Sequence, residues 1–100
     1  MRIVAVTACP TGIAHTYMAA SALKKAAQQI GIHITVETQG AMGIENQLNF
    51  QDIGRADVVL IASDIEIEHR ARFTGSTIHC VTIEEVLTDA TSVLARCQEL

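Results

Sequence analysis

The sequence has 100 residues, a length that favours a single domain able to bury its own core without disulfides or metal ions. Apolar residues make up 49% of it and aromatic residues only 3%, so we expect a core of isoleucine, valine, leucine and alanine. The net charge of −4 and the absence of a basic patch from the sequence argue against nucleic acid as a partner.

The three cysteines, Cys9, Cys80 and Cys97, show no C-x-x-C spacing. We expect Cys80 and Cys97 to be buried as small apolar residues, and reduced thiols favour the cytoplasm. No leader segment is expected, because the predicted first strand begins by residue 2 or 3. No apolar run reaches the ~18 residues of a membrane span, and we expect no metal ion and no cofactor.

The first part of the chain is predicted to form a strand, a helix and a second strand. Residues 2–7 form a continuous apolar run, which predicts a strand covered on both faces. Residues 12–30 carry a helical apolar stripe, and Gly31 suits the left-handed position that ends a helix. Residues 32–37 alternate in polarity, which predicts an edge strand with His33 and Glu37 on its wet face.

A loop with two glycines follows at residues 38–43, at the same sheet edge as Cys9 if the sheet is parallel. A short helix is predicted for residues 49–55, with Asn49 as its N-cap and Asp52 three positions later. Residues 58–62 are a third apolar strand.

The last part of the chain is predicted to add a strand and two helices. Asp64 is expected to be an N-cap, and residues 65–73 to form a short helix whose charges make a solvated face. A fourth strand covers residues 77–81. A capping box from Thr82 to Glu85 opens the final helix, in which a break near Asp89 is expected.

Strands that alternate with helices predict a single three-layer α/β/α domain around a four-stranded parallel sheet. The expected strand order is 2-1-3-4, with the strands numbered along the chain. The crevice between the first and third strands is then the place where such Rossmann-like folds bind ligands. Cys9 would sit above it, in a phosphatase-like loop after the first strand.

Cys9 therefore faces the first turn of a helix, where unpaired N–H groups and the helix dipole favour an anion. The same field favours thiolate over thiol, so we expect a lowered pKa and a nucleophilic sulfur. Pro10 ends the strand sharply, and Gly12 lets the backbone approach an anion closely. The predicted phosphate-binding loop is Pro10, Thr11, Gly12, Ile13, Ala14, His15 and Thr16, with Cys9 as the catalytic residue.

Two side chains in this region remain ambiguous. His15 could face an incoming phosphate or a partner, or could be exposed at the rim. Tyr17 fits the core or the rim better than a catalytic role. The hydroxyls of Thr11 and Thr16 could join the backbone N–H groups in binding phosphate.

Residues 7–16, Thr-Ala-Cys-Pro-Thr-Gly-Ile-Ala-His-Thr, resemble the signature of the fructose-family IIB components of the bacterial phosphoenolpyruvate-dependent sugar phosphotransferase system (PTS). The resemblance continues through residues 36–40, 43–46, 56–59 and 72–75, so residues 1–100 are expected to be one PTS EIIB type-2 (fructose-like) domain. One departure is Ser76, where the family commonly has a lysine after the glycine matched by Gly75.

The resemblance implies an activity and two partners. The cysteine matched by Cys9 takes a phosphoryl group from a phosphohistidine on a IIA protein or domain. It then passes this group to fructose or a fructose-like sugar bound by the membrane-embedded IIC transporter. The implied protein is a cytoplasmic phosphotransferase that associates with the inner face of the membrane through IIC and does not itself span it.

Three other classes of protein share parts of this pattern. A low-molecular-weight tyrosine phosphatase shares the architecture but needs an arginine six residues after its cysteine, where this sequence has His15. A thiol oxidoreductase needs a second cysteine, which the stretch Cys9-Pro10-Thr11-Gly12 lacks. A nucleotide- or flavin-binding module could hold phosphate without using the thiol, but the sequence offers few aromatic residues to flank a ring.

Overall fold

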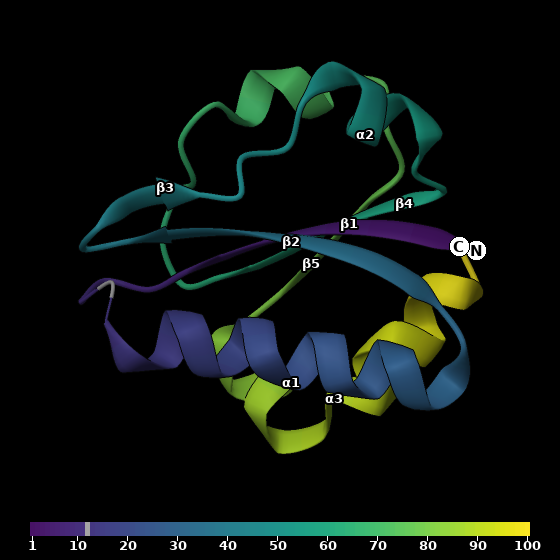
Figure 1. Cartoon of the computed structure of the whole chain (residues 1–100), viewed down its shortest axis with the longest axis horizontal. Coiled ribbons are helices and arrows are strands. Elements are labelled where there is room, and N and C mark those ends of the chain that lie inside the picture. The colour runs from purple at the N-terminus through teal and green to yellow at the C-terminus, as the bar shows by residue number, and fades with distance from the viewer. Residues whose placement is uncertain (12) are drawn as a thin grey trace.

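The computed structural model describes residues 1–11 and 13–100, and Figure 1 shows the arrangement of its elements. In chain order these are β1 (Arg2–Ala8), α1 (Ala14–Ile30), β2 (His33–Gly40), β3 (Gly43–Glu45), α2 (Phe50–Arg55), β4 (Val58–Ser63), the 3-10 helix η1 (Arg70–Phe73), β5 (Ile78–Val81) and α3 (Ile83–Gln98).

The sheet has five strands in the order β3-β2-β1-β4-β5. β1 lies between β2 and β4, parallel to both, and β5 is parallel to β4. Helices α1 and α3 cover one face of the sheet, and α2 with η1 covers the other (Figure 1). The predicted three layers are confirmed. The predicted sheet of four parallel strands in the order 2-1-3-4 is wrong, because a fifth strand, β3, precedes the succession β2-β1-β4-β5 and makes the sheet mixed.

The additional strand is β3, which pairs antiparallel with the end of β2 through a tight turn. Gly43, at φ 89°, adopts the left-handed conformation that this reversal requires. The expected loop at residues 38–43 is therefore largely strand, and β2 is an edge strand only in its first half, where His33 is exposed as predicted. A three-residue strand carries too little periodicity to be recognised in the sequence.

Alternate residues of the central strands fill two cores, one on each face of the sheet. Ile3 and Ala5 of β1 pack towards α1 and α3. Val4 and Val6 pack on the other face, against residues that include Ile53 of α2 and Phe73 of η1. The continuous apolar run of β1 is explained by this burial on both faces.

Several helix ends follow their local sequence signals. Gly31 ends α1 with φ 75°, and its N–H donates to the carbonyl of Ala27. Capping boxes open α2 at Asn49 and α3 at Thr82, and Asp89 breaks α3 with φ −159° and ψ 83°. Within the described part of the chain, none of the helices combines the length and apolar character needed to cross a bilayer.

The segment after β4 differs from its prediction. The helix expected over residues 65–73 is reduced to the four residues of η1. Asp64 caps no helix that follows it directly; its Oδ1 accepts a hydrogen bond from the backbone N–H of Ile83, in the first turn of α3, at 3.2 Å. The carboxylate thus satisfies a donor that is distant in sequence, which local patterns do not predict.

Candidate functional site

Cys9 directly follows β1 and faces the start of α1. Cys9 is 4% exposed. The Thr16 hydroxyl donates a hydrogen bond to its Sγ at 3.0 Å, and the Thr11 Oγ1 lies 3.5 Å from the same sulfur. Two hydroxyls thus approach Sγ, an arrangement that favours the charged thiolate over the thiol.

Thr16 is held in place from both sides. Its side chain bonds Cys9, and its backbone carbonyl accepts a hydrogen bond from the Thr7 hydroxyl at 3.0 Å. Both threonines are fully buried. The sequence suggested the Thr16 hydroxyl as a ligand of phosphate, whereas the structure places it on the sulfur.

The other described residues of the predicted loop lie at the surface. Pro10, Thr11, Ala14 and His15 are exposed, as is Ile13 at 61%. The exposure of His15 agrees with either of the roles considered for it. Gly12 lies outside the described residues, so its predicted role in the cradle remains a prediction.

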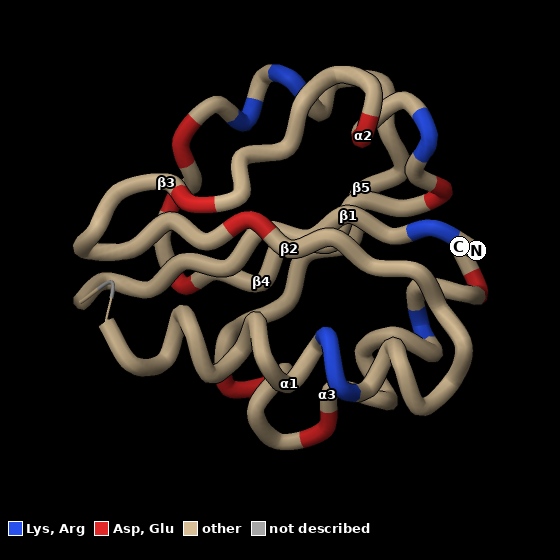
Figure 2. The backbone as a smooth tube through the Cα atoms, viewed as in Figure 1, with Lys and Arg blue, Asp and Glu red and all other residues tan. Residues whose placement is uncertain are grey.

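The beginning of α1 is suited to an anion. The helix starts at Ala14, and the residue before it, Ile13, makes no side-chain cap. The first turn has no acidic residue, and the sequence of residues 9–16 contains no Lys, Arg, Asp or Glu; the start of α1 is accordingly tan in Figure 2. An anion here would be met by backbone N–H groups and the helix dipole rather than by a cation.

A hollow of about 260 Å³ opens beside Cys9. Its walls come from the carboxyl ends of β2, β1 and β4, where the sequence predicted a ligand crevice. The lining residues are Cys9, Pro10, Thr11, Gln39, Gly40, Ala41, Ile65, Glu66 and Glu68. No arginine is among the described residues of this lining.

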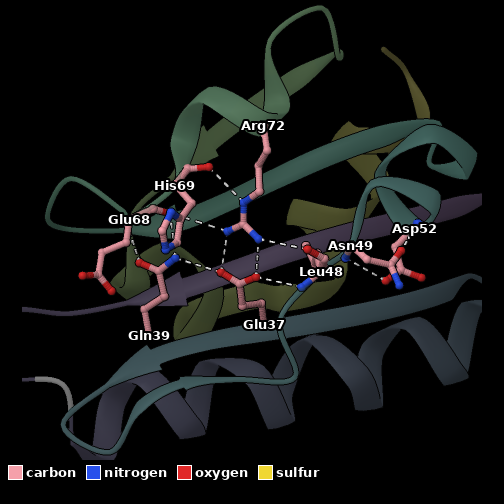
Figure 3. Close-up of polar contacts among 8 residues, drawn as sticks. All are labelled: Glu37, Gln39, Leu48, Asn49, Asp52, Glu68, His69 and Arg72. Atoms are coloured by element: carbon pink, nitrogen blue, oxygen red, sulfur yellow. Dashed lines mark hydrogen bonds and ion pairs between the residues drawn. The ribbon is translucent and has the colours of Figure 1, made fainter.

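A buried ion pair behind this hollow was not predicted (Figure 3). Glu37 is fully buried and meets Arg72, whose side chain is 8% exposed, in a bidentate contact with both N–O distances at 2.6 Å. Glu37 was expected on a wet strand face and Arg72 on a solvated helix face. Both expectations are wrong, because η1 and the residues before α2 cover this part of β2.

Burial alone would raise the pKa of Glu37. The hydrogen bonds from Arg72, Gln39 and the N–H of Leu48 outweigh that effect and hold this pKa below its usual value. The partners Glu37 and Arg72 lie 35 positions apart, and no local pattern joins them. The sequence indicated only an acid on a strand and a base in a short predicted helix.

The two remaining cysteines have different surroundings. Cys97 is fully buried as predicted, and burial raises the pKa of its thiol to about 11. The prediction for Cys80 is wrong: it is exposed on β5, with Arg70 Nη2 3.8 Å from its sulfur. β5 is the edge strand of the sheet, and the helices on the two faces leave the Cys80 side chain open to solvent.

Comparisons with known proteins identify the family of the chain. The family described as "PTS system, Lactose/Cellobiose specific IIB subunit" matches residues 4–96. The chain is 45% identical over 97 residues to the PTS system fructose-like EIIB component 2 of Escherichia coli K12, covering 97% of this chain and 92% of that protein. The PTS system fructose-specific EIIB'BC component of Rhodobacter capsulatus is 46% identical over 94 residues, which are 94% of this chain and 16% of that protein.

Among solved structures, a predicted fructose-specific IIB from Escherichia coli superposes with a TM-score of 0.92 at 41% identity, covering 98% of this chain and 87% of that one. The chain belongs to the PTS IIB family, as a fructose-like EIIB component. The family resemblance recognised in residues 7–16 is thereby confirmed, and Cys9 stands at the position expected of the phosphoryl-accepting cysteine.

Proposed function

We propose that this chain is a phosphocysteine carrier that takes a phosphoryl group onto Cys9 and delivers it to fructose or a fructose-like sugar. The observation that carries the proposal is the placement of Sγ: it accepts a hydrogen bond from Thr16 at 3.0 Å, in front of the uncharged first turn of α1. A nucleophile and an anion site coincide there. Membership of the IIB family supports the same chemistry.

In the first step the Cys9 thiolate attacks the phosphorus of a phosphohistidine on a IIA protein or domain. The S–P bond forms as the P–N bond breaks, and the imidazole leaves with the electron pair of that bond and is protonated. Residues 10–16 are proposed to surround the transferring group. Their backbone N–H groups would stabilise its charge, which is where most of the catalysis lies.

In the second step a hydroxyl of the sugar attacks the phosphorus, the S–P bond breaks, and Sγ leaves as the thiolate. The hydroxyl proton passes to a base outside this chain or to water. The hydrogen bond from Thr16 supports this step too, since it stabilises the departing thiolate. Between the steps the phosphoryl group must survive on sulfur.

The absence of an arginine from the described residues around Cys9 favours this survival. A cysteine phosphatase relies on an arginine to hold the phosphoryl group in the transition state, and the position six residues after Cys9 is the exposed His15. Arg72, whose Nη2 reaches the carbonyl of the hollow-lining Glu68, has its guanidinium occupied by Glu37. These features support a carrier over a hydrolase.

The sugar site is proposed to belong to a membrane IIC partner, with which the chain would associate at the cytoplasmic face. The relatives include a fused EIIB'BC component and a fused EIIBC component, in which both parts occur in one chain. This supports a IIC partner. The IIA donor follows from the family's chemistry. Residues 1–100 are proposed to act as one EIIB domain, and as a protein-phosphohistidine–sugar phosphotransferase.

The test follows radiolabelled phosphoryl groups. The chain is incubated with phosphoenolpyruvate, the general phosphotransferase proteins and IIA, and label on the chain is then chased onto fructose by membranes that contain IIC. Wild type should take up one label per chain and lose it to sugar. Cys9→Ser should take up none.

Cys80→Ala and Cys97→Ala are the matched controls, since neither residue lines the Cys9 hollow. Both should carry label as the wild type does. Full labelling of Cys9→Ser, or label that passes to water at the same rate with and without IIC and sugar, would contradict the proposal.

A further inference from the structure

The residues behind the Cys9 hollow form a buried polar network that joins three separate parts of the chain (Figure 3). Arg72 uses every N–H of its guanidinium. Nε donates to the carbonyl of His69, Nη1 to Glu37 and the carbonyl of Leu48, and Nη2 to Glu37 and, at 3.5 Å, to the carbonyl of Glu68. The strand β2, the residues before α2 and the turn into η1 are thereby tied together.

Gln39 connects this network to the hollow. Its Nε2 donates to Glu37 at 2.8 Å and to the carbonyl of Glu68 at 3.1 Å, while its Oε1 accepts from the N–H of Glu68 at 2.8 Å. The side-chain amide thus binds both the N–H and the carbonyl of Glu68. Gln39 and Glu68 both line the hollow beside Cys9.

The polar atoms of Gln39 are all engaged within the protein. Both of its N–H groups and its carbonyl oxygen have partners, so the side chain has no donor left for a phosphoryl group. Its contribution to chemistry at Cys9 would therefore be indirect. The orientation of the amide is fixed because Glu37, itself held by Arg72, accepts only from the nitrogen side.

The turn that follows Glu68 also depends on this network. His69 has φ 59°, a left-handed conformation that is uncommon for a residue with a side chain. Its carbonyl accepts hydrogen bonds from both the Nε and the backbone N–H of Arg72. The network therefore stabilises a backbone reversal that places residues 65–68 along the hollow.

We propose that Gln39 is a positioning residue for phosphoryl transfer, held in place by Glu37 and Arg72, and that it fixes the wall of residues 65–68 against the Cys9 loop. Such a wall would act by orienting the reacting groups, because displacement of a reacting group by about 1 Å lowers the rate by up to about 100-fold. This inference rests on the proposed transfer at Cys9. It adds a group that touches neither phosphorus nor sulfur.

The test compares Gln39→Leu with Val86→Ala in the full chain. Val86 is buried on α3, on the opposite face of the sheet, so its truncation lowers stability without touching the network. Gln39→Asn is a second variant that keeps the amide but is too short to reach Glu37 and Glu68 together. It serves if Gln39→Leu does not fold.

Two measurements are made on each variant. Amide hydrogen exchange of residues 65–68 should speed up by about 10-fold or more in Gln39→Leu and stay close to wild type in Val86→Ala. The maximal rate of phosphoryl uptake from IIA should fall by about 10- to 100-fold, with the KM for IIA changed by less than about twofold. A purely structural role would lower thermal stability in both variants and slow neither.

The inference is overturned if Gln39→Leu transfers phosphoryl as fast as Val86→Ala, or if the Glu68 amide keeps its wild-type protection. It is also overturned if the KM for IIA rises while the maximal rate stays unchanged, because the wall would then serve docking. If wild type takes no phosphoryl group at all, the proposed function fails. The exchange data would still show whether Gln39 fixes the wall.

Discussion

Removing the hydrogen bond from Thr16 to Cys9 tests directly whether this hydroxyl stabilises the thiolate. Thr16→Val removes the hydroxyl with little change of shape. The backbone carbonyl that Thr7 binds is retained, so α1 stays attached to β1. The substitution therefore isolates one donor, which lies 3.0 Å from Sγ in a fully buried position.

The size of the effect follows from the charge on the acceptor. A hydrogen bond to a charged group contributes about 1.5–3 kcal/mol. We therefore expect the pH midpoint of thiolate formation at Cys9 to rise by about one to two units, at 1.36 kcal/mol per unit. The hydroxyl of Thr11 lies farther from Sγ, at 3.5 Å, and is exposed, so Thr11→Val should raise the midpoint less.

The assay is the rate of alkylation by iodoacetamide across a pH series, followed by mass spectrometry of the Cys9 peptide. All variants carry Cys80→Ala, because Cys80 is exposed and would compete. Cys97 is 0% exposed, whereas Cys9 is 4% exposed and lines a hollow that the reagent can enter. Circular dichroism verifies the fold. An unchanged midpoint in a folded Thr16→Val chain would refute the view that this hydroxyl stabilises the thiolate.

Three further predictions concern stability, and each is checked by urea denaturation. Burial raises the pKa of the Cys97 thiol from 9.0 to about 11. The neutral thiol therefore contributes fully to the free energy of unfolding below pH 9.0, and this contribution is lost as the pH rises towards 11. The loss should approach about 3 kcal/mol in wild type and be missing in Cys97→Ala. The pKa of Glu37 is lowered, so its contribution is present above the ordinary value of 4.5 and lost as pH falls through the folded-state value. Glu37→Gln should lower the free energy of unfolding by about 3–5 kcal/mol at neutral pH and should remove most of its decrease at acid pH. A variant whose stability falls as steeply with acid as that of wild type would contradict the assignment. Gly31→Ala should cost about 1 kcal/mol through its φ of 75° alone, since nothing lies within 4 Å of an added Cβ, and Gly31→Asn should cost less.

Features that depend on neighbouring residues could be predicted from the sequence. The capping boxes at Asn49 and Thr82 and the end of α1 at Gly31 are local hydrogen-bond patterns, and all three form as expected. The parallel pairing of β1, β2, β4 and β5 followed from the alternation of strands with helices. The cysteine loop was recognisable because strand, cysteine, proline, glycine and helix occur in a compact run.

Features that depend on distant pairing could not be predicted in this way. Glu37 is buried because Arg72 reaches it from η1, and Asp64 binds a backbone N–H of α3. Cys80 is exposed because it lies on the edge strand β5, where the covering helices leave its side chain open to solvent. In each case the sequence specifies the residue, while its environment comes from elements that meet only in three dimensions.

The central claim is that the phosphoryl group resides on the sulfur of Cys9. The most direct measurement is the site of phosphorylation in wild-type chain labelled through IIA, read by tandem mass spectrometry of the peptide that contains residues 9–16. We predict one phosphoryl group, on Cys9. Phosphate on His15 with Cys9 unmodified would contradict the account.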